Sequence, residues 1–133
     1  MPGDPLVRQA ECKLAGDRAQ VQAARQFVAD LLGGLWPDVD EAVLLTSELA
    51  ANAVVHSTSG RPGGKFTVRA TLKQRDHLRV EVEDEGGPWT ETASDGEHGH
   101  GLMIVSTIAS DWGRSGDPTT GWTVWARIDW PSA

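Results

Sequence analysis

Two adjacent stretches with alternating apolar residues constrain the fold more than any other feature of the chain. In residues 65–74 and 77–85, apolar side chains occupy every second position: Phe66, Val68, Ala70, Leu72, Leu78, Val80 and Val82. A period of two is typical of a β-strand with one buried face. The short link near Arg75 and Asp76 predicts that the two strands form an antiparallel hairpin, which needs a second layer to cover its apolar face.

Helical spacing is found on both sides of this hairpin. Residues 17–34 carry apolar side chains three and four apart, with Asp17 as N-cap and Gly33 and Gly34 closing the helix. A second helix is expected from about 38 to 57 and a third over residues 101–112, with shorter strands at 8–14 and 122–130. This order of elements predicts an α+β two-layer sandwich, with helices on one face of a mixed, mostly antiparallel sheet.

Length and composition limit the possible functions. The 133 residues predict a single domain, with residues 1–7 as a flexible N-terminus, and the net charge of -7 argues against direct nucleic-acid binding. Cys12 is the only cysteine, so no internal disulfide can form. No apolar run approaches the roughly 20 residues of a membrane helix, and we expect a cytoplasmic protein without a membrane partner.

The stretch "SELAANAVVH" in the second expected helix carries polar residues at an unusual spacing. Glu48, Asn52 and His56 are four apart and therefore form a ladder on one side of the helix, which they share with Leu45 and Leu49. Either this side of the helix lies only at the edge of the core, or it forms one wall of a pocket. In a pocket, Asn52 could offer its oxygen to a hard cation, and Glu48 could orient or deprotonate a nucleophile.

Two glycine-bearing segments favour the pocket. Asp84 ends an expected strand and is followed after one residue by Gly86 and Gly87, so its carboxylate can accept a hydrogen bond from a flat heterocycle that approaches the backbone. Gly99 and Gly101 precede the third expected helix, where free amides can cradle a phosphate. Each segment alone also fits a plain turn or helix start, and neither a P-loop nor a Rossmann motif is present.

Taken together, "ELAANAVVH", "VEDEGG", "GHGL" and "GWTVW" resemble the ATP-binding boxes of the histidine-kinase-like (GHKL) ATPase superfamily. The resemblance extends from about residue 9 to 130 and is greatest to the anti-sigma-factor serine/threonine kinases and their actinobacterial relatives. It implies the Bergerat-type ATP-binding fold and, as cofactors, ATP and Mg²⁺.

By this resemblance, Asn52 coordinates Mg²⁺, Glu48 is the catalytic base or orienting carboxylate, and Asp84 holds the adenine amino group. The other implied nucleotide contacts are Gly86 beside the adenine, Gly99, Gly101 and Leu102 at the triphosphate, and Thr123 in support of the adenine site. The sequence departs from the family pattern at Pro88, where a glycine is common, and at His100, where arginine or lysine is frequent. The segment between Pro88 and His98 resembles the lid over the nucleotide.

The resemblance implies an ATP- and Mg²⁺-dependent serine/threonine protein kinase that acts as an anti-sigma factor in transcription regulation. Its implied partners are a sigma factor and a small anti-anti-sigma protein of the STAS type, with a homodimer possible. Two alternatives stay open at this point: an ATP-binding module that switches partner binding without catalysis, and an α+β interaction domain without a nucleotide. A metal site built from His56, His98 and His100 is a further, less favoured hypothesis.

Overall fold

The computed structural model describes the backbone of residues 6–56, 64–85, 98–117 and 119–131, and their side chains except those of residues 55, 56 and 98–102. Within these ranges, three helices and five strands follow in this order: β1 (Val7–Ala15), α1 (Ala19–Leu32), α2 (Val39–His56), β2 (Lys65–Lys73), β3 (His77–Glu83), α3 (His98–Ile108), β4 (Asp111–Asp117) and β5 (Gly121–Asp129). None of the described helices combines the length and apolar character needed to cross a membrane.

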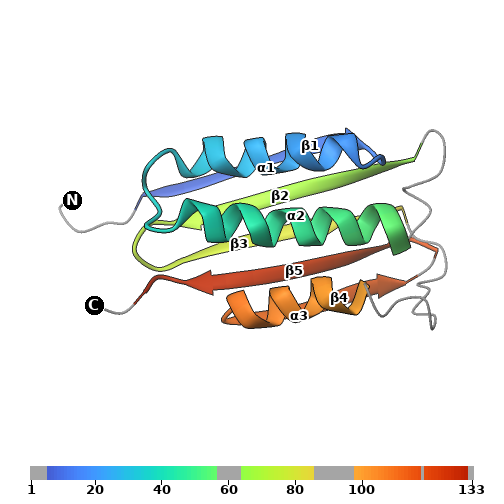
Figure 1. Cartoon of the computed structure of the whole chain (residues 1–133). Helices are drawn as coiled ribbons and strands as arrows, with labels where there is room; N and C mark the ends of the chain where they lie inside the picture. The colour runs from blue at the N-terminus through green and yellow to red at the C-terminus, as the bar shows by residue number, and fades with distance from the viewer. Residues whose placement is uncertain (1–5, 57–63, 86–97, 118, 132–133) are drawn as a thin grey trace.

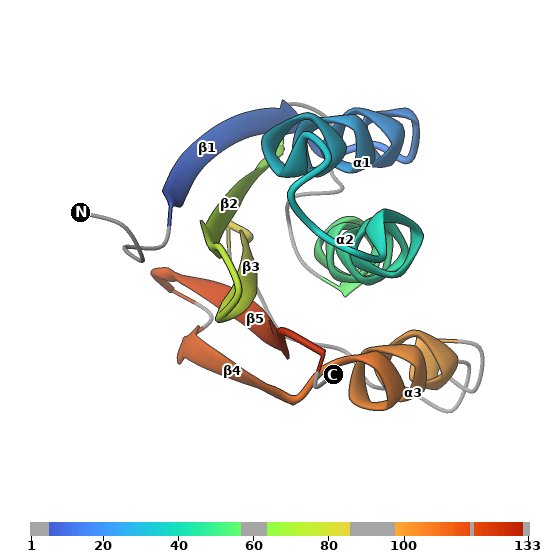
Figure 2. The same ribbon diagram turned by 90° about the vertical axis from the view of Figure 1, so that its left-hand side faces the viewer.

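The strands form one sheet in the order β1-β2-β3-β5-β4, and every described pairing is antiparallel (Figure 1). All three helices lie on one face of this sheet (Figure 2). The predicted two-layer α+β sandwich is therefore confirmed, as is the hairpin of β2 and β3. Its turn contains Arg75 in a left-handed conformation, with φ of 65°.

The core lies between the helical layer and the sheet. It includes the alternating apolar positions of β2 and β3 together with these residues of the helices and the other strands: Ala24, Val28, Leu32, Trp36, Ala42, Leu45, Leu49, Ala50, Ala53, Val105, Val124, Ala126 and Ile128. None of the described helices covers the opposite face of the sheet, which carries charged pairs (Figure 2). There Arg69 contacts Glu11 at 2.9 Å and Glu83 at 2.6 Å, and the guanidinium of Arg79 lies 4.4 Å from the ring centre of Trp125.

The ends of the first two helices follow from local chemistry. A side-chain oxygen of Asp17 accepts a hydrogen bond from the backbone N–H of Gln20 at 3.1 Å, and Asp38 caps the start of α2 in the same way. At the other end of α1, Gly33 adopts φ of +49° and its N–H donates to the carbonyl of Ala29. These contacts confirm the N-cap and the glycine terminator predicted for the first helix.

The third helix and the strand after it differ from the sequence-based expectation. The helix spans His98–Ile108 rather than residues 101–112, and Asp111–Asp117 forms the unpredicted edge strand β4. This segment, "DWGRSGD", has no apolar alternation because it is largely exposed. Its strand conformation depends on pairing with β5, where Gly113 leaves room for the indole of Trp125: a Cβ on Gly113 would lie 3.0 Å from that ring.

Candidate functional site

Four elements meet at one end of the molecule. α2 ends and α3 begins at the edge of the sheet where β3 ends and β5 begins (Figure 1). α2 packs against β2, β3 and β5. Asn52, near the end of α2, and Asp84, directly after β3, therefore lie at the same end of the two layers.

The polar ladder of α2 follows the edge of the core. Leu45 and Leu49 are fully buried, Asn52 is 5% exposed, and Glu48 is partly exposed. The side-chain nitrogen of Asn52 is buried and has no hydrogen-bond partner in the described part of the chain. A buried amide without a partner costs about 1–3 kcal/mol, so a position that keeps one calls for an explanation. The side chain of the third ladder residue, His56, lies outside the described residues.

Asp84 is fixed by the beginning of β5. Its N–H donates to the carbonyl of Trp122 at 2.8 Å, and its Oδ1 accepts from the N–H of Trp122 at 3.0 Å. Gly121 makes this approach possible, because it has φ of +114° and a Cβ there would lie 2.4 Å from the carbonyl oxygen of Asp84. The carboxylate is 5% exposed and held in one orientation, as a hydrogen-bond acceptor in a binding pocket must be.

Sequence reasoning missed the positioning roles of Gly121 and Trp122. Gly121 stands at the start of the predicted last strand, and a glycine in that place is a signal for close backbone approach. The guanidinium of Arg114 lies 4.8 Å from the ring centre of Trp122. Arg114 pairs with Val124, which is buried against the helices, so both face the helical side of the sheet.

The glycines of "GHGL" lie inside α3 rather than before it. Because the helix begins at His98, Gly99 and Gly101 belong to its first turn, followed by Leu102. The first four N–H groups of a helix have no partner within it and carry the positive end of its dipole. This placement corrects the predicted helix start and keeps these backbone amides suited to an anion.

Thr123 is not brought together with the other predicted site residues. It pairs with Glu83, and the neighbouring pair of Val82 and Val124 is buried against the helices. Since side chains alternate along a strand, Thr123 faces the open side of the sheet, opposite to Asn52 and Asp84. Gly86, Pro88 and the rest of the predicted lid lie outside the described residues, as do the side chains of the three histidines of the alternative metal hypothesis.

The donor set on α2 fits a magnesium ion that accompanies a nucleotide. Mg²⁺ prefers oxygen ligands and is usually held by one or two side chains together with phosphate oxygens. The carboxamide oxygen of Asn52 and the carboxylate of Glu48 one turn earlier are oxygen ligands of this kind. The unpartnered nitrogen of Asn52 is a hydrogen-bond donor and would suit a phosphate oxygen beside the ion. Among the described residues, no three His, Cys, Asp or Glu side chains are grouped so that they could hold a metal ion.

A known protein family matches most of the chain. A family model described as "Histidine kinase-like ATPase domain" matches residues 14–128, from the end of β1 almost to the end of β5. No curated protein matches the chain. The matched range includes Glu48, Asn52 and Asp84, together with the first turn of α3.

Proposed function

The chain belongs to the histidine kinase-like ATPase family, and from this premise we propose that it is an ATP- and Mg²⁺-dependent serine/threonine protein kinase acting as an anti-sigma factor. In this proposal it phosphorylates a small anti-anti-sigma protein of the STAS type. It also binds a sigma factor and so regulates transcription. The family match supports ATP binding; the serine/threonine specificity and the two partners are the proposal's own.

The observation that carries the proposal is the unpartnered amide of Asn52. Asn52 and Asp84 are polar residues of the candidate site, and both are almost fully buried. Asp84 has its backbone partner in Trp122, whereas the nitrogen of Asn52 has none in the described part of the chain. A phosphate oxygen of a bound nucleotide would accept a hydrogen bond from this nitrogen, and the carboxamide oxygen of the same side chain would be available to Mg²⁺.

Phosphoryl transfer asks the protein mainly to position groups and to stabilise charge. In the proposal, the carboxylate of Asp84, which the N–H of Trp122 holds in place, accepts a hydrogen bond from the adenine amino group. The free N–H groups in the first turn of α3 are suited to the phosphates, and bound Mg²⁺ would neutralise part of their charge. Glu48 is partly exposed, so its carboxylate can orient an incoming hydroxyl and accept its proton.

The test separates transfer from binding. The protein is incubated with γ-labelled ATP, Mg²⁺ and candidate STAS-type proteins, and ATP affinity is measured in parallel. Glu48→Ala should lower transfer by about 100-fold or more, the usual contribution of a general base, while ATP affinity stays within about threefold. Asp30→Asn, which removes an exposed carboxylate from α1, is the matched control and should leave both unchanged.

Each outcome has a distinct meaning. Transfer that survives Glu48→Ala would reject the role of this carboxylate. Binding of ATP without transfer to any STAS-type protein would reject the kinase proposal in favour of a nucleotide-controlled binding module. Transfer confined to residues other than serine and threonine would reject the proposed specificity.

A further inference from the structure

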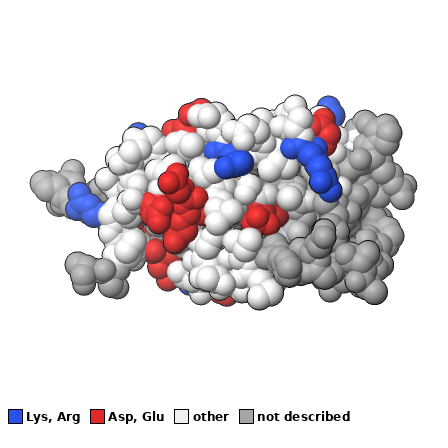
Figure 3. Space-filling model, viewed as in Figure 1, with Lys and Arg blue, Asp and Glu red and all other residues white. Residues whose placement is uncertain are grey.

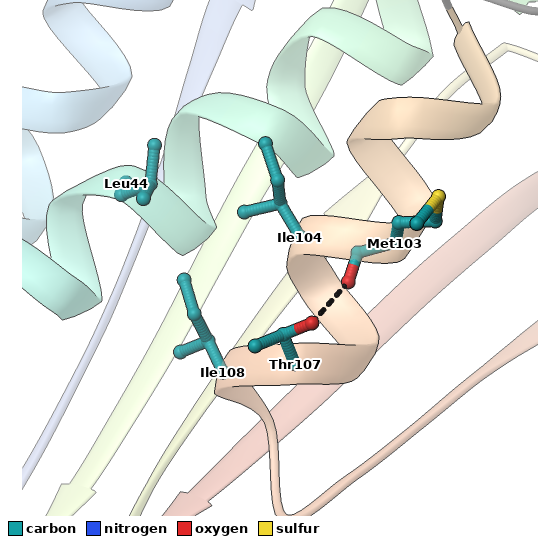
Figure 4. A pocket seen from close by; sticks show the side chains of 5 residues that line it. All are labelled: Leu44, Met103, Ile104, Thr107 and Ile108. Atoms are coloured by element: carbon teal, nitrogen blue, oxygen red, sulfur yellow. Dashed lines mark hydrogen bonds between the residues drawn. The ribbon is translucent and has the colours of Figure 1, made fainter.

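An apolar groove lies between α2 and α3, on the side of these helices that faces away from the sheet. Its lining residues are Leu44 from α2 and Met103, Ile104, Thr107 and Ile108 from α3 (Figure 4), and its volume is about 420 Å³. In Figure 4, Ile104 and Ile108 extend from α3 toward α2, where Leu44 lies. The groove is therefore formed by side chains of two helices, and neither Asn52 nor Asp84 lines it.

Two of the lining residues are unusually exposed for their type. Leu44 is 42% exposed and Met103 is 65% exposed; the other large exposed hydrophobics of the described chain, Leu6 and Val7, lie at the start of β1. Methionine adapts to differently shaped apolar partners and is common at protein-binding surfaces. An apolar patch of this kind in a groove between helices is typical of a site for another apolar surface.

The polar groups of the groove favour a helix over a small polar ligand. Small-molecule sites combine an apolar lining with several polar groups that fix the ligand's orientation. Here the only side-chain hydroxyl among the lining residues, that of Thr107, donates to the carbonyl of Met103 at 2.8 Å. The groove thus offers apolar contacts, as do grooves that receive the apolar face of an amphipathic helix.

The charge beside the groove is of one sign. Asp40 lies four residues before Leu44 on the same side of α2, Glu41 lies three before it, and neither α2 nor α3 contains a lysine or arginine. Figure 3 shows acidic side chains gathered over the start of α2, on the face that also presents α3 in Figure 1. Neither carboxylate forms an ion pair within the described part of the chain.

The charged form of Glu41, one of the two acidic residues that form the cluster beside the groove, is disfavoured in this structure. Partial burial and the neighbouring charge of Asp38 raise the pKa of Glu41. Both effects oppose the charged form, and a cation placed nearby would relieve the second of them. The cluster is therefore complementary to lysine or arginine side chains.

We propose that the groove between α2 and α3 docks an amphipathic helical segment of a partner protein, with apolar side chains against Leu44 and Met103 and flanking lysine or arginine residues facing Asp40 and Glu41. A second copy of this chain fits less well, because its net charge is also negative, at -7. The acidic rim likewise opposes the anionic surface of a membrane. The proposal concerns a surface separate from the nucleotide pocket and does not depend on the proposed kinase activity.

The test uses fluorescently labelled model peptides of about 18 residues, long enough for a helix of several turns. One carries a leucine face flanked by lysines, the second the same leucine face flanked by glutamates, and the third the first composition in scrambled order. Binding to the full chain is measured by anisotropy without nucleotide. We expect saturable binding of the lysine-flanked peptide, at least about tenfold tighter than that of either other peptide.

Variants identify the surface. Leu44→Gln and Met103→Gln should each weaken binding by about fivefold or more, since each removes apolar contact area from the groove. Asp40→Asn combined with Glu41→Gln should weaken it by about threefold or more at low salt, and this difference should vanish near 0.5 M NaCl because of screening. Val7→Thr, at an equally exposed apolar position on β1, is the matched control and should have no effect.

The proposal is overturned if the glutamate-flanked peptide binds as well as the lysine-flanked one, or if Leu44→Gln and Val7→Thr behave alike. Sedimentation that shows a dimer broken by Leu44→Gln would assign the groove to a second copy and also overturn it. Thermal melts verify that each variant is folded. Because the peptides are measured without ATP, failure here leaves the kinase proposal untouched, and failure of ATP binding leaves this one untouched.

Discussion

Replacing Asn52 with leucine should separate the stability of the fold from its ability to bind a nucleotide. The side chain of Asn52 is 5% exposed, and its nitrogen has no hydrogen-bond partner in the described chain. In the nucleotide-free protein, this nitrogen therefore loses its hydrogen bonds to water without gaining others. Leucine is close to asparagine in length and requires no partner, so Asn52→Leu should leave the free protein at least as stable as the wild type.

The magnitude follows from the cost of the unpaired group. We expect the free energy of unfolding to rise by about 1–3 kcal/mol, less any strain that the larger leucine introduces beside Leu49 and Ala53. For a chain of 133 residues, 1 kcal/mol corresponds to about 3–4 °C in Tm. Without ligand, Asn52→Leu should therefore melt at the wild-type temperature or up to about 10 °C above it.

ATP should reverse this order. At a concentration of ATP·Mg²⁺ about 100 times the Kd, binding stabilises the wild type by about 2.7 kcal/mol, or roughly 10 °C. The variant lacks the amide oxygen proposed to coordinate Mg²⁺ and should show less than about a quarter of this shift. Scanning fluorimetry with and without ATP·Mg²⁺ measures both quantities in one experiment.

Thr46→Val is the matched control. Thr46 is a fully buried polar residue of the same helix, but its hydroxyl donates to the carbonyl of Ala42 at 2.9 Å and so is satisfied. This variant should lose up to about 1.5 kcal/mol and keep the full ATP shift. Destabilisation of the nucleotide-free Asn52→Leu protein by more than about 1 kcal/mol, or retention of its ATP shift, would refute the reasoning.

Two further predictions concern the hairpin of β4 and β5. Gly121→Ala should cost about 2 kcal/mol or more in urea unfolding and weaken ATP binding, because its Cβ would strike the carbonyl of Asp84 at 2.4 Å; unchanged values would contradict the close approach. The pKa of Asp117 is lowered by hydrogen bonds from the backbone N–H groups of Thr120 and Thr119. Because the pKa of Asp117 is lower in the folded protein than the value of about 3.9 in the unfolded chain, the charged carboxylate stabilises the fold above that pH, and this stabilisation is lost as pH falls through the folded-state pKa. The difference in Tm between wild type and Asp117→Ala should therefore shrink below about pH 4 and stay constant above about pH 6.

The sequence predicted the elements whose local pattern agrees with their burial. β2 and β3 alternate because one face packs on the helices, and α1 carries both its cap at Asp17 and its terminator at Gly33. In these elements, each local preference indicates the same structure as the tertiary packing. For the side of α2 on which the ladder was predicted, Leu45 and Leu49 lie in the core and Asn52 is almost fully buried, while the side chain of His56 lies outside the described residues.

β4 could not be predicted because nothing in its own residues requires a strand. Five of its seven residues are exposed, and it contains two glycines, which strands disfavour. Its conformation results from pairing with β5, and Gly116 and Gly121 make this pairing close: a Cβ at Gly116 would lie 2.1 Å from the carbonyl oxygen of Gly121. Such tertiary requirements leave only a weak trace in a single sequence, namely two glycines in and beside a turn.

In the candidate site, too, some features could be predicted from the sequence and others could not. Asn52 and Asp84 were identified from spacing and from the order of the motifs, and both are buried polar groups. The face on which Thr123 lies depends on the register between β3 and β5, which a single sequence does not determine. A shift of one residue would reverse it, because strand side chains alternate. The anchoring of Asp84 by Trp122 likewise depends on this register.

The central claim is that Asp84 and the end of α2 form a pocket for an adenine nucleotide, and calorimetric titration with ATP and GTP in the presence of Mg²⁺ tests it most directly. Asp84 can accept a hydrogen bond from the amino group of adenine, whereas guanine presents a carbonyl oxygen there. A hydrogen bond to a charged group is worth about 1.5–3 kcal/mol, so ATP should bind about 10- to 100-fold more tightly than GTP. Equal affinity for the two nucleotides, or no binding of ATP, would contradict the account.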